Sequence, residues 1–277
     1  MEKENGCLSD VGGRCARFGI CFVAVVLSCF GCVTGSAVDL IHSYDFNNGF
    51  ADSVGGASGT LMGNAQIQGG WLTLPGSVSP RQNYGSIPAS VMNGLTSATF
   101  EGWFTLQAVN SNGKFFMAGA PDLKNYIEFD TNRGPAPGST YSSASQSELD
   151  VFSNAPLATG VEYYFATVYD SSADEMRLYV SSGNSVSLVG AKSVPNLDLS
   201  TLSYSQFFLG ASVGWGDRDL NGAIDEFHIW NGALDSSTIT QHFQAGPNPL
   251  PEPSGSMLLT VGVVAGMSLR RNRAVER

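Results

Sequence analysis

Apolar and polar residues alternate in short segments through the middle of the chain, and this pattern predicts β-strands. In Glu175–Val180, for example, Met176, Leu178 and Val180 fall on one face and the more polar residues fall on the other. Gly, Ser, Asn and Asp separate such segments, which is typical of antiparallel strands with one buried side. The predicted strands are Asp39–Phe46, Trp71–Leu74, Thr99–Leu106, Lys114–Met117, Asn125–Phe129, Tyr163–Tyr169, Glu175–Val180, Gln206–Leu209 and Ala223–Trp230.

Local signals add one hairpin and one short helix. Asp170–Asp174 is a polar loop between two predicted strands and indicates a hairpin. Asp235 is placed to cap a helix on which Ile239 and Phe243, four residues apart, share a face, and Gly246 ends it. No long helical period appears elsewhere in this part of the chain. The pattern therefore predicts an all-β sandwich or barrel.

The first 37 residues have the pattern of a secretory signal peptide. Positive residues precede the apolar stretch Phe18–Phe30, and the small residues Gly35, Ser36 and Ala37 follow it. We therefore expect a signal helix within residues 1–37 and cleavage after Ala37. A retained membrane anchor is the competing interpretation.

All five cysteines lie in this leader. Disulfides, thiolate metal sites and cysteine nucleophiles are therefore excluded from residue 38 onward. A lipoprotein site at Cys29 is an alternative, but Leu27 fits that pattern poorly. The domain must rely on its own core, and about 210 residues are enough for one.

The exported part is strongly acidic. Residues 38–250 carry 19 acidic and seven basic side chains, a formal net charge of −12. Such a surface repels phosphate backbones, so nucleic acid is excluded as a partner. Divalent cations suit the charge, and solubility alone is the simpler explanation.

A Pro-rich linker is expected over residues 247–256, directly after a domain that we place at residues 38–246. The linker contains Pro251, Glu252 and Pro253. Proline-rich segments of this kind are extended spacers.

The last segment, residues 257–277, combines an apolar run with a positive cluster. Met257–Leu269 is 13 residues long, about 20 Å as a helix, and Arg270, Arg271 and Arg273 follow it. A bilayer core is about 30 Å thick, so this short transmembrane helix would hold a precursor with its arginines on the cytoplasmic side. With the preceding Pro-Glu-Pro, the order resembles the PEP-CTERM sorting signal of bacteria. The resemblance implies cleavage near Pro-Glu-Pro by an exosortase-like sorting protease and a location at the cell envelope or outside the cell. An apolar disordered tail is the alternative.

Four segments of the domain resemble the laminin G-like, concanavalin A-like jelly rolls. Gly222–Leu234 follows the closing pattern G-x-I-D-E-[aliphatic]-R-I-[aromatic]-N-x-A-L, with Phe227 for the aliphatic residue and His228 for Arg. Thr99–Phe104 matches T-[aliphatic]-E-x-W-[aliphatic], and Leu178–Val180 matches L-Y-V. The opening of the family is matched by Tyr44–Phe46, Asp52–Gly55 and Gly59–Leu61.

The resemblance implies two antiparallel sheets packed face to face as a jelly roll, flanked by the signal helix and the C-terminal apolar helix. This fold hosts lectins, adhesion modules and enzymes, so it does not decide a function. Together with the export signals, it leads us to expect an exported, envelope-associated, non-catalytic module that binds carbohydrate or an extracellular matrix partner. A glucanase-like enzyme and a structural protein of a biofilm matrix are the alternatives.

Asp225 is the first candidate for a metal ligand. On a regular strand it shares a face with Phe227 and Ile229, which would turn its carboxylate toward the core. A buried carboxylate must be paired, hydrogen-bonded or bound to metal. The family resemblance implies a structural calcium near the opening and closing strands, with Asp45 and Asp225 as ligands. The alternative is that Asp225 only accepts backbone hydrogen bonds.

A second calcium pattern lies just before this strand. Asp217, Asp219 and Asn221 follow the first half of an EF-hand-like loop, but the twelfth position, which supplies a bidentate acid, is His228. An acidic turn is therefore the favoured interpretation, and a loose surface calcium site is the alternative.

Glycosidase chemistry is tested by the spacing of acids. Glu128 and Asp130 begin the E-x-D-x-x-E pattern of retaining glucanases, but its sixth position is Arg133. Glycoside hydrolysis needs two facing carboxyl groups, so the pattern predicts no catalytic residue here. The three histidines lack metal-ligand spacing, and no nucleophile-elbow motif occurs.

Trp215 is the candidate ligand-binding residue. It lies in the Gly-rich loop Gly210–Asp219 between two predicted strands. An exposed tryptophan on a rigid sandwich stacks well on a sugar ring, whereas packing over the sheet edge is the alternative. Tyr84 and Tyr141 are weaker candidates of the same kind.

Overall fold

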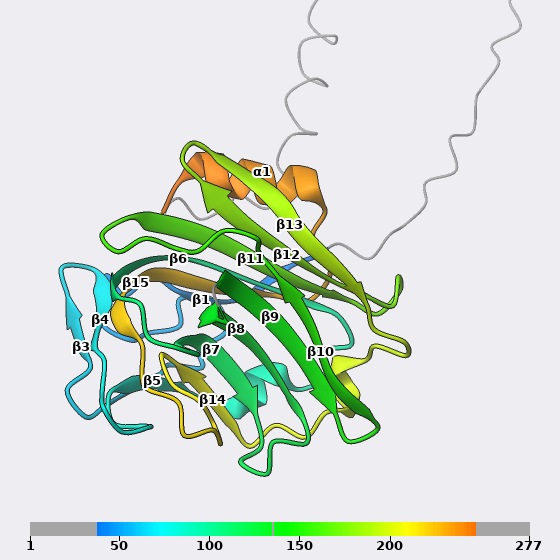
Figure 1. The fold of residues 1–277 in the computed structure, drawn as a ribbon, viewed down its shortest axis with the longest axis horizontal. Coiled ribbons are helices and arrows are strands. Elements are labelled where there is room, and N and C mark those ends of the chain that lie inside the picture. The colour runs from blue at the N-terminus through cyan, green and yellow to red at the C-terminus, as the bar shows by residue number, and fades with distance from the viewer. Residues whose placement is uncertain (1–37, 135, 248–277) are drawn as a thin grey trace, which may run out of the picture. The chain divides into compact units, whose positions relative to one another are not determined.

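Two antiparallel sheets packed face to face form the domain, as the sequence predicts (Figure 1). The computed structural model describes residues 38–134 and 136–247, which form an eight-stranded sheet A, a seven-stranded sheet B and one α-helix. Sheet A consists, from edge to edge, of β13 (Ser185–Ser193), β12 (Glu175–Ser182), β11 (Glu162–Asp170), β6 (Ala98–Ala108), β15 (Asn221–Trp230), β4 (Trp71–Pro75) and β3 (Gln66–Gln68), with β1 (Leu40–Tyr44) also paired to β15.

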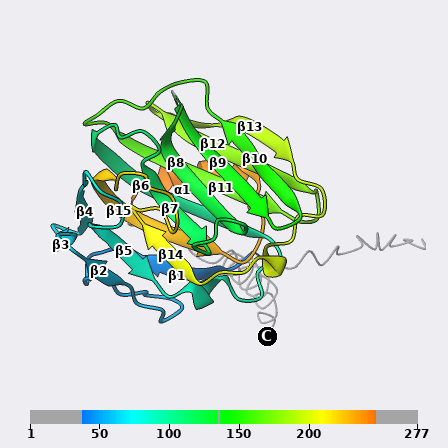
Figure 2. The same cartoon turned by 60° about the horizontal axis from the view of Figure 1, so that its bottom comes forward.

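Sheet B is the second layer, and several of its strands face the viewer in Figure 2. It consists, from edge to edge, of β10 (Gln146–Phe152), β9 (Ala136–Ser143), β8 (Tyr126–Arg133), β7 (Lys114–Gly119), β14 (Gln206–Leu209), β5 (Tyr84–Ile87) and β2 (Thr60–Met62). Two 3₁₀ turns, η1 (Ala89–Met92) and η2 (Leu199–Thr201), connect strands of the two layers.

The space between the sheets is filled by aromatic rings. Phe129 of β8 and Phe165 of β11 stack across the two layers, with ring centroids 4.1 Å apart. Phe100, Phe116 and Phe227 join the same buried cluster. Aromatic residues at every second position of a strand fill an interlayer space of about 10 Å, which is why the alternating pattern predicts this architecture.

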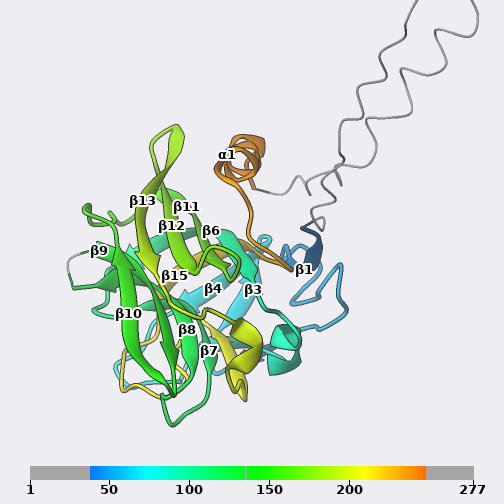
Figure 3. The same cartoon turned by 90° about the vertical axis from the view of Figure 1, so that its right-hand side faces the viewer.

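The helix α1 (Ser236–Ala245) covers part of the outer side of sheet A (Figure 3). As predicted, Asp235 caps it by accepting a 2.8 Å hydrogen bond from Thr238 N, and Gly246 ends it at a φ of 76°. Phe243 stacks on Trp103 of β6 at 5.4 Å, so the helix is attached by apolar contact.

The buried carboxylate of Glu101, on β6, also contacts α1. It accepts hydrogen bonds from Trp230 Nε1 (2.8 Å) and from the Tyr164 hydroxyl (2.5 Å), and His242 Nδ1 of α1 lies 3.0 Å away. His228 Nδ1 is 3.5 Å from the same carboxylate. Burial alone would raise the pKa of Glu101, but hydrogen bonds from the two histidines outweigh it and hold the pKa well below its usual range.

The nine predicted strands are all present, and the Asp170–Asp174 hairpin joins β11 to β12. Strands that the pattern missed are short, as β2, β3 and β5 are, rich in Ser and Gly, as β9 and β13 are, or polar over their first half, as β10 is. Such strands have weak intrinsic preferences, and pairing with their neighbours forms them.

Asp225 is buried, as predicted, but the regular strand alternation predicted around it is wrong. The pairing of β15 with β6 shifts between Ile224 and Glu226, so Asp225 is the extra residue of a β-bulge. Ile224 and Phe227 both lie in the core cluster. The bulge interrupts the period of two, and Asp225 therefore does not share the core face with Phe227.

The predicted signal peptide and the sorting tail lie outside the described residues, as do Pro251, Glu252, Pro253, Arg270 and Arg271. Within residues 38–134 and 136–247, no helix is long and apolar enough to cross a bilayer.

Candidate functional site

The outer side of sheet B carries buried charged side chains. On β8, Ile127 and Phe129 point into the core, so strand alternation turns Glu128 and Asp130 to the opposite side. Both of these carboxylates are nevertheless buried. An isolated buried carboxylate is unstable, so its neighbours decide its charge.

Lys114 of β7 lies among these carboxylates. Its Nζ is 2.7 Å from Asp130 Oδ1, 3.4 Å from Glu128 Oε2 and 3.3 Å from Asp217 Oδ2. Burial by itself lowers the pKa of Lys114, but the three carboxylates outweigh it and hold that pKa above its usual value. Lys114 is therefore a cation that joins β7, β8 and the loop after β14.

Arg133, the last residue of β8, extends the cluster toward the sheet edge. Its Nη1 pairs with Glu128 and donates to Thr140 Oγ1 at 2.7 Å. Its Nη2 is 2.6 Å from Glu148 Oε2 and 3.4 Å from Asp150 Oδ1, both on β10. The Glu148 and Asp150 side chains are 36% and 24% exposed, so the polar groups reach solvent here. We name this cluster the polar face; its members are Lys114, Glu128, Asp130, Arg133, Thr140, Glu148 and Asp150.

Glu128 is the most perturbed acid of the polar face. Burial, and after it the charge of Asp130, raises the pKa of Glu128 to about 8. The glucanase pattern would place a second acid at position 133. Arg133 stands there instead and is an ion-pair partner of Glu128.

Two exposed aromatic rings belong to the same side of sheet B. Among the described residues, Trp215 and Phe152 are the exposed tryptophan and phenylalanine, at 39% and 42%. Phe152 follows Asp150 on β10 by two residues and pairs with Gly138 of β9. A Cβ added to Gly138 would lie 2.5 Å from Phe152 Cδ1, so one edge of the ring lies against this glycine. Gly138 and Thr140 share one side of β9, which places Phe152 beside the polar face.

Trp215 lies in the loop after β14, and hydrogen bonds to its backbone fix its position. Its N–H donates to Ser212 Oγ at 2.8 Å, and its carbonyl accepts from Arg81 Nη1 at 2.9 Å. Val213, two residues earlier, packs against Met117 of β7, so the loop lies on the outer side of sheet B. The structure therefore places Trp215 in an ordered, exposed position, and its binding role stays a prediction.

Asp219 stabilises the loop that contains Arg81, the residue that contacts the Trp215 carbonyl. Its buried carboxylate accepts hydrogen bonds of 2.7–2.8 Å from the backbone N–H groups of Arg81, Gln82 and Asn83. Arg81 has a φ of 55°, a conformation that these bonds stabilise. Asp219 accepts backbone hydrogen bonds, and Asp217 pairs with Lys114. Both contacts are compatible with an acidic turn, and the surface calcium site stays a prediction.

The predicted calcium ligands have separate neighbours. Asp45 accepts a 3.0 Å hydrogen bond from Asn47 N, and Asp225 lies near Glu162. Burial, and after it the charge of Asp225, raises the pKa of Glu162. In the described part of the chain, no group of three or more His, Asp or Glu side chains is placed to hold a metal ion. Calcium takes six to eight oxygen ligands, so these side chains do not make up a calcium site by themselves, and calcium binding stays a prediction.

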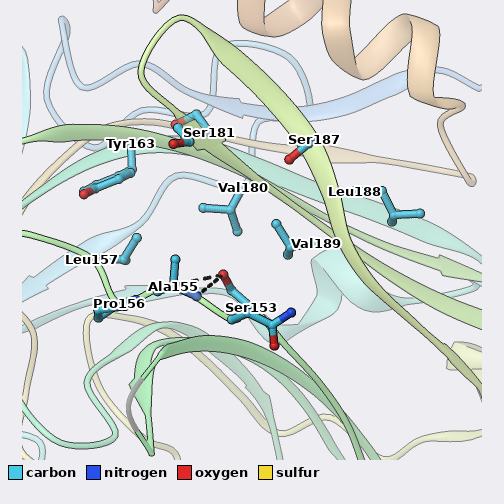
Figure 4. A pocket seen from close by; sticks show the side chains of 12 residues that line it. Ser153, Ala155, Pro156, Leu157, Tyr163, Val180, Ser181, Ser187, Leu188 and Val189 are labelled. Carbon is cyan, nitrogen blue, oxygen red and sulfur yellow. Dashed lines mark hydrogen bonds between the residues drawn. The ribbon is translucent and has the colours of Figure 1, made fainter.

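A groove of about 390 Å³ opens where β10 and β13, the edge strands of the two sheets, come together (Figure 4). The segment Ser153–Leu157, which follows β10, forms one wall. Residues of β12 and β13, including Val180 and Val189, form the other, and Tyr163 of β11 closes one end. We name it the edge groove.

Sequence reasoning missed Phe152, the acids of β10 and the edge groove. The available signal was the alternation of Glu148 and Asp150 with Leu149 and Val151. That signal is weak because the outward residues of β10 are charged and its partner β9 is rich in Ser and Gly. No pattern in the sequence brings β10 and β13 together, because the two strands belong to different sheets.

Three solved structures with a similar fold were determined as complexes whose names give a ligand. Domain 4 of AbnA, a GH43 extracellular arabinanase from Geobacillus stearothermophilus in complex with arabinotriose, is 22% identical, with a TM-score of 0.57, over 74% of this chain and 98% of that one. The CBM40 of Ruminococcus gnavus IT-sialidase bound to α2,3-sialyllactose is 11% identical, with a TM-score of 0.51, over 62% and 97%. The binding domain of botulinum neurotoxin DC in complex with SialylT is 16% identical, with a TM-score of 0.56, over 75% and 51%.

Sequence comparison gives the family. No curated protein sequence matches the chain. The family model Laminin_G_3 matches residues 79–240, from the loop before β5 into helix α1. This range contains the polar face, the Trp215 loop and the whole closing signature Gly222–Leu234. The chain therefore belongs to the concanavalin A-like lectin/glucanases superfamily.

Proposed function

We propose that this protein is a non-catalytic carbohydrate-binding module that acts outside the cytoplasm, at the cell envelope or in its matrix. The observation that carries the proposal is the pair of exposed aromatic rings, Trp215 and Phe152, on the side of sheet B that also holds the polar face. The sugar complexes named for the similar folds support it as an analogy of fold.

The chemistry of this surface suits a sugar ring. An aromatic ring stacks on the apolar C–H face of a sugar, and hydroxyl groups at the ring edge need fixed donors and acceptors. Arg133, Glu148 and Asp150 reach solvent beside Phe152 and are held by their mutual ion pairs. Binding such a ligand needs little reordering, because these side chains are already fixed.

The charge of the surface points to the class of sugar. If Asp217 is counted with the polar face and Glu128 is taken as protonated, four carboxylates surround two bases here. The bases are already paired with carboxylates, so an acidic glycan would meet repulsion. We therefore propose a neutral or amino-substituted glycan rather than a sialylated or uronic one.

The glucanase-like alternative rests on Glu128. With a pKa raised to about 8, this acid holds a proton at neutral pH, as a general acid must. Against this, Glu128 is fully buried and is paired with Lys114 and Arg133. Reducing-sugar release from a panel of neutral glucans, lost in Glu128→Gln, would support the enzyme over the binding module.

The location of the protein is proposed from its two ends. A cleaved signal peptide over residues 1–37 and a sorting tail over residues 257–277 would deliver the domain to the cell surface or the medium. An exosortase-like protease is the partner that such a tail requires. Mass spectrometry of the mature protein tests both, because the predicted product starts at Val38 and ends near Pro251.

A glycan array, run with and without calcium, tests the binding function. We expect binding to neutral glycans that weakens in Trp215→Ala and in Phe152→Ala, each by about 1 kcal/mol or roughly fivefold. Val54→Ala, at another exposed apolar position, is the matched control. Glycan affinity that is unchanged in both Trp215→Ala and Phe152→Ala would contradict the proposal, and so would a preference for sialylated glycans. Binding that needs calcium would support the predicted ligands Asp45 and Asp225.

A further inference from the structure

The edge groove is a preformed cavity. Ser153 N donates to Pro137 O at 2.9 Å, and Ala158 N donates to the Tyr163 hydroxyl at 3.0 Å, so the loop wall is tied at both ends. Ser153 Oγ also accepts from Ala155 N at 3.2 Å, which rigidifies the turn between the two ties (Figure 4). A volume of about 390 Å³ lies within the range of small-ligand pockets, about 300–1,000 Å³.

Strand pairing forms the opposite wall. Ser181 Oγ accepts a 2.8 Å hydrogen bond from Tyr164 N, which joins β12 to β11. Gly190 of β13 lies close to Val151 of β10, since an added Cβ would come within 2.4 Å of the valine Cγ2. The two sheets therefore meet beside the groove, and its width is set by the paired strands on one side and by the hydrogen-bonded segment Ser153–Leu157 on the other.

The lining of the groove is uncharged throughout, although the chain has a net charge of −10. Leu157, Val180 and Val189 form an apolar floor, and the Tyr163 ring stands at one end. Hydroxyl and amide groups, among them those of exposed Ser187, surround this floor. The phenolic oxygen of Tyr163 accepts from Ala158 N, and its hydrogen can be donated to a ligand oxygen.

We propose that the edge groove is a second binding site, separate from the Trp215 and Phe152 surface, and that it takes one or two units of a neutral sugar. A sugar presents C–H groups on one face and hydroxyls around its edge, which matches an apolar floor with a hydroxyl rim. A fatty chain would leave the serine rim without partners, and an ionic ligand would find no counter-charge.

Hydrogen–deuterium exchange with mass spectrometry localises binding on the purified protein. The probes are arabinotriose and cellotriose as neutral sugars and the monosaccharide N-acetylneuraminic acid as the acidic one. We expect slower exchange in the segments 153–158 and 185–189 with at least one neutral probe and no change there with N-acetylneuraminic acid. Unchanged exchange in both segments with both neutral probes would overturn the proposal, as would protection by N-acetylneuraminic acid.

Two substitutions fill the groove from opposite walls, and a third is the matched control. Ala155→Trp and Ser187→Trp should abolish protection of the groove segments while melting like the unmodified protein. Ala191 is an exposed residue of β13 outside the groove, so Ala191→Trp should leave the protection of the groove segments unchanged. Protection that persists in both filled variants would overturn the site.

The outcome is independent of the first site. Trp215→Ala should leave protection of the groove segments unchanged, whereas the filled variants should leave protection around Trp215 unchanged. If any one substitution abolished protection both around Trp215 and in the groove segments, the two regions would form a single site. That result would contradict the proposal of a second site.

Discussion

Replacing Glu101 by Gln is the most demanding test of the forces that hold α1 on sheet A. The carboxylate is 2% exposed and receives donors from Trp230, Tyr164 and His242, with His228 at 3.5 Å. Gln keeps the size and one acceptor oxygen but removes the charge and turns an NH₂ group toward these donors. Breaking a buried charged pair costs about 3–5 kcal/mol, which corresponds to a fall in melting temperature of about 10 °C in a domain of this size.

The effect should depend on pH in a defined direction. The lowered pKa of Glu101 stabilises the fold above its unfolded value of 4.5, and this contribution is lost only as the pH falls through the lower folded value. Burial by itself lowers the pKa of His228, but the hydrogen bond to Glu101 and the charge of Glu226 outweigh it and raise the pKa above 6.5. That contribution is present below 6.5 and is lost as the pH rises through the folded value. The network is therefore strongest between 4.5 and 6.5.

Urea unfolding of both proteins, at about pH 5.5 and about pH 9, measures these differences. The gap between the unmodified protein and Glu101→Gln should be larger at the lower pH. Glu175→Gln is the control, because that side chain is 37% exposed and 3.8 Å from Arg177, so its removal should change stability by less than about 0.5 kcal/mol. A gap below about 1 kcal/mol at pH 5.5 would refute the reasoning, and an equal gap at both pH values would refute its histidine part.

Three further changes test the outer side of sheet B. Lys114→Met should lower the free energy of unfolding by about 3–5 kcal/mol at neutral pH in urea melts, because it leaves the buried Asp130 with only the more distant Arg133, 3.7 Å away. Protonation of the acids as the pH is lowered should restore part of this loss. Asp219→Ala should lower the free energy of unfolding by about 3 kcal/mol, because three backbone N–H groups lose their buried acceptor. Unchanged stability would show that water replaces the carboxylate. Gly138→Val should displace the Phe152 ring, so that glycan affinity measured by calorimetry falls about as much as in Phe152→Ala; retained affinity would argue against the ring as a platform.

Much of the fold follows from local pattern. Period-two segments with aromatic residues specify strands that bury one side, and the Asp235 cap with Gly246 specifies α1. These features depend on neighbours a few residues away, so their physical cause is present in the sequence itself. The closing signature Gly222–Leu234 carries the family in the same local way.

Other features of the candidate sites arise only when distant strands meet. The bulge at Asp225 comes from pairing with β6, which no spacing along β15 records. The same is true of the polar face, where Lys114 and Arg133 pair with acids of β8, of β10 and of the loop after β14. It is also true of Phe152, whose ring needs the space beside Gly138.

The sequence by itself determined an acidic all-β domain without cysteines from residue 38 onward, because composition and short-range alternation are local properties. Tertiary structure alone decided that Glu128 is paired with Arg133 instead of facing a second acid, that Trp215 and Phe152 occupy one side of sheet B, and that the meeting edges of the sheets leave a groove. The physical reason is that ion pairs, stacking platforms and cavities depend on distances between strands, and those distances exist only after the sheets have packed.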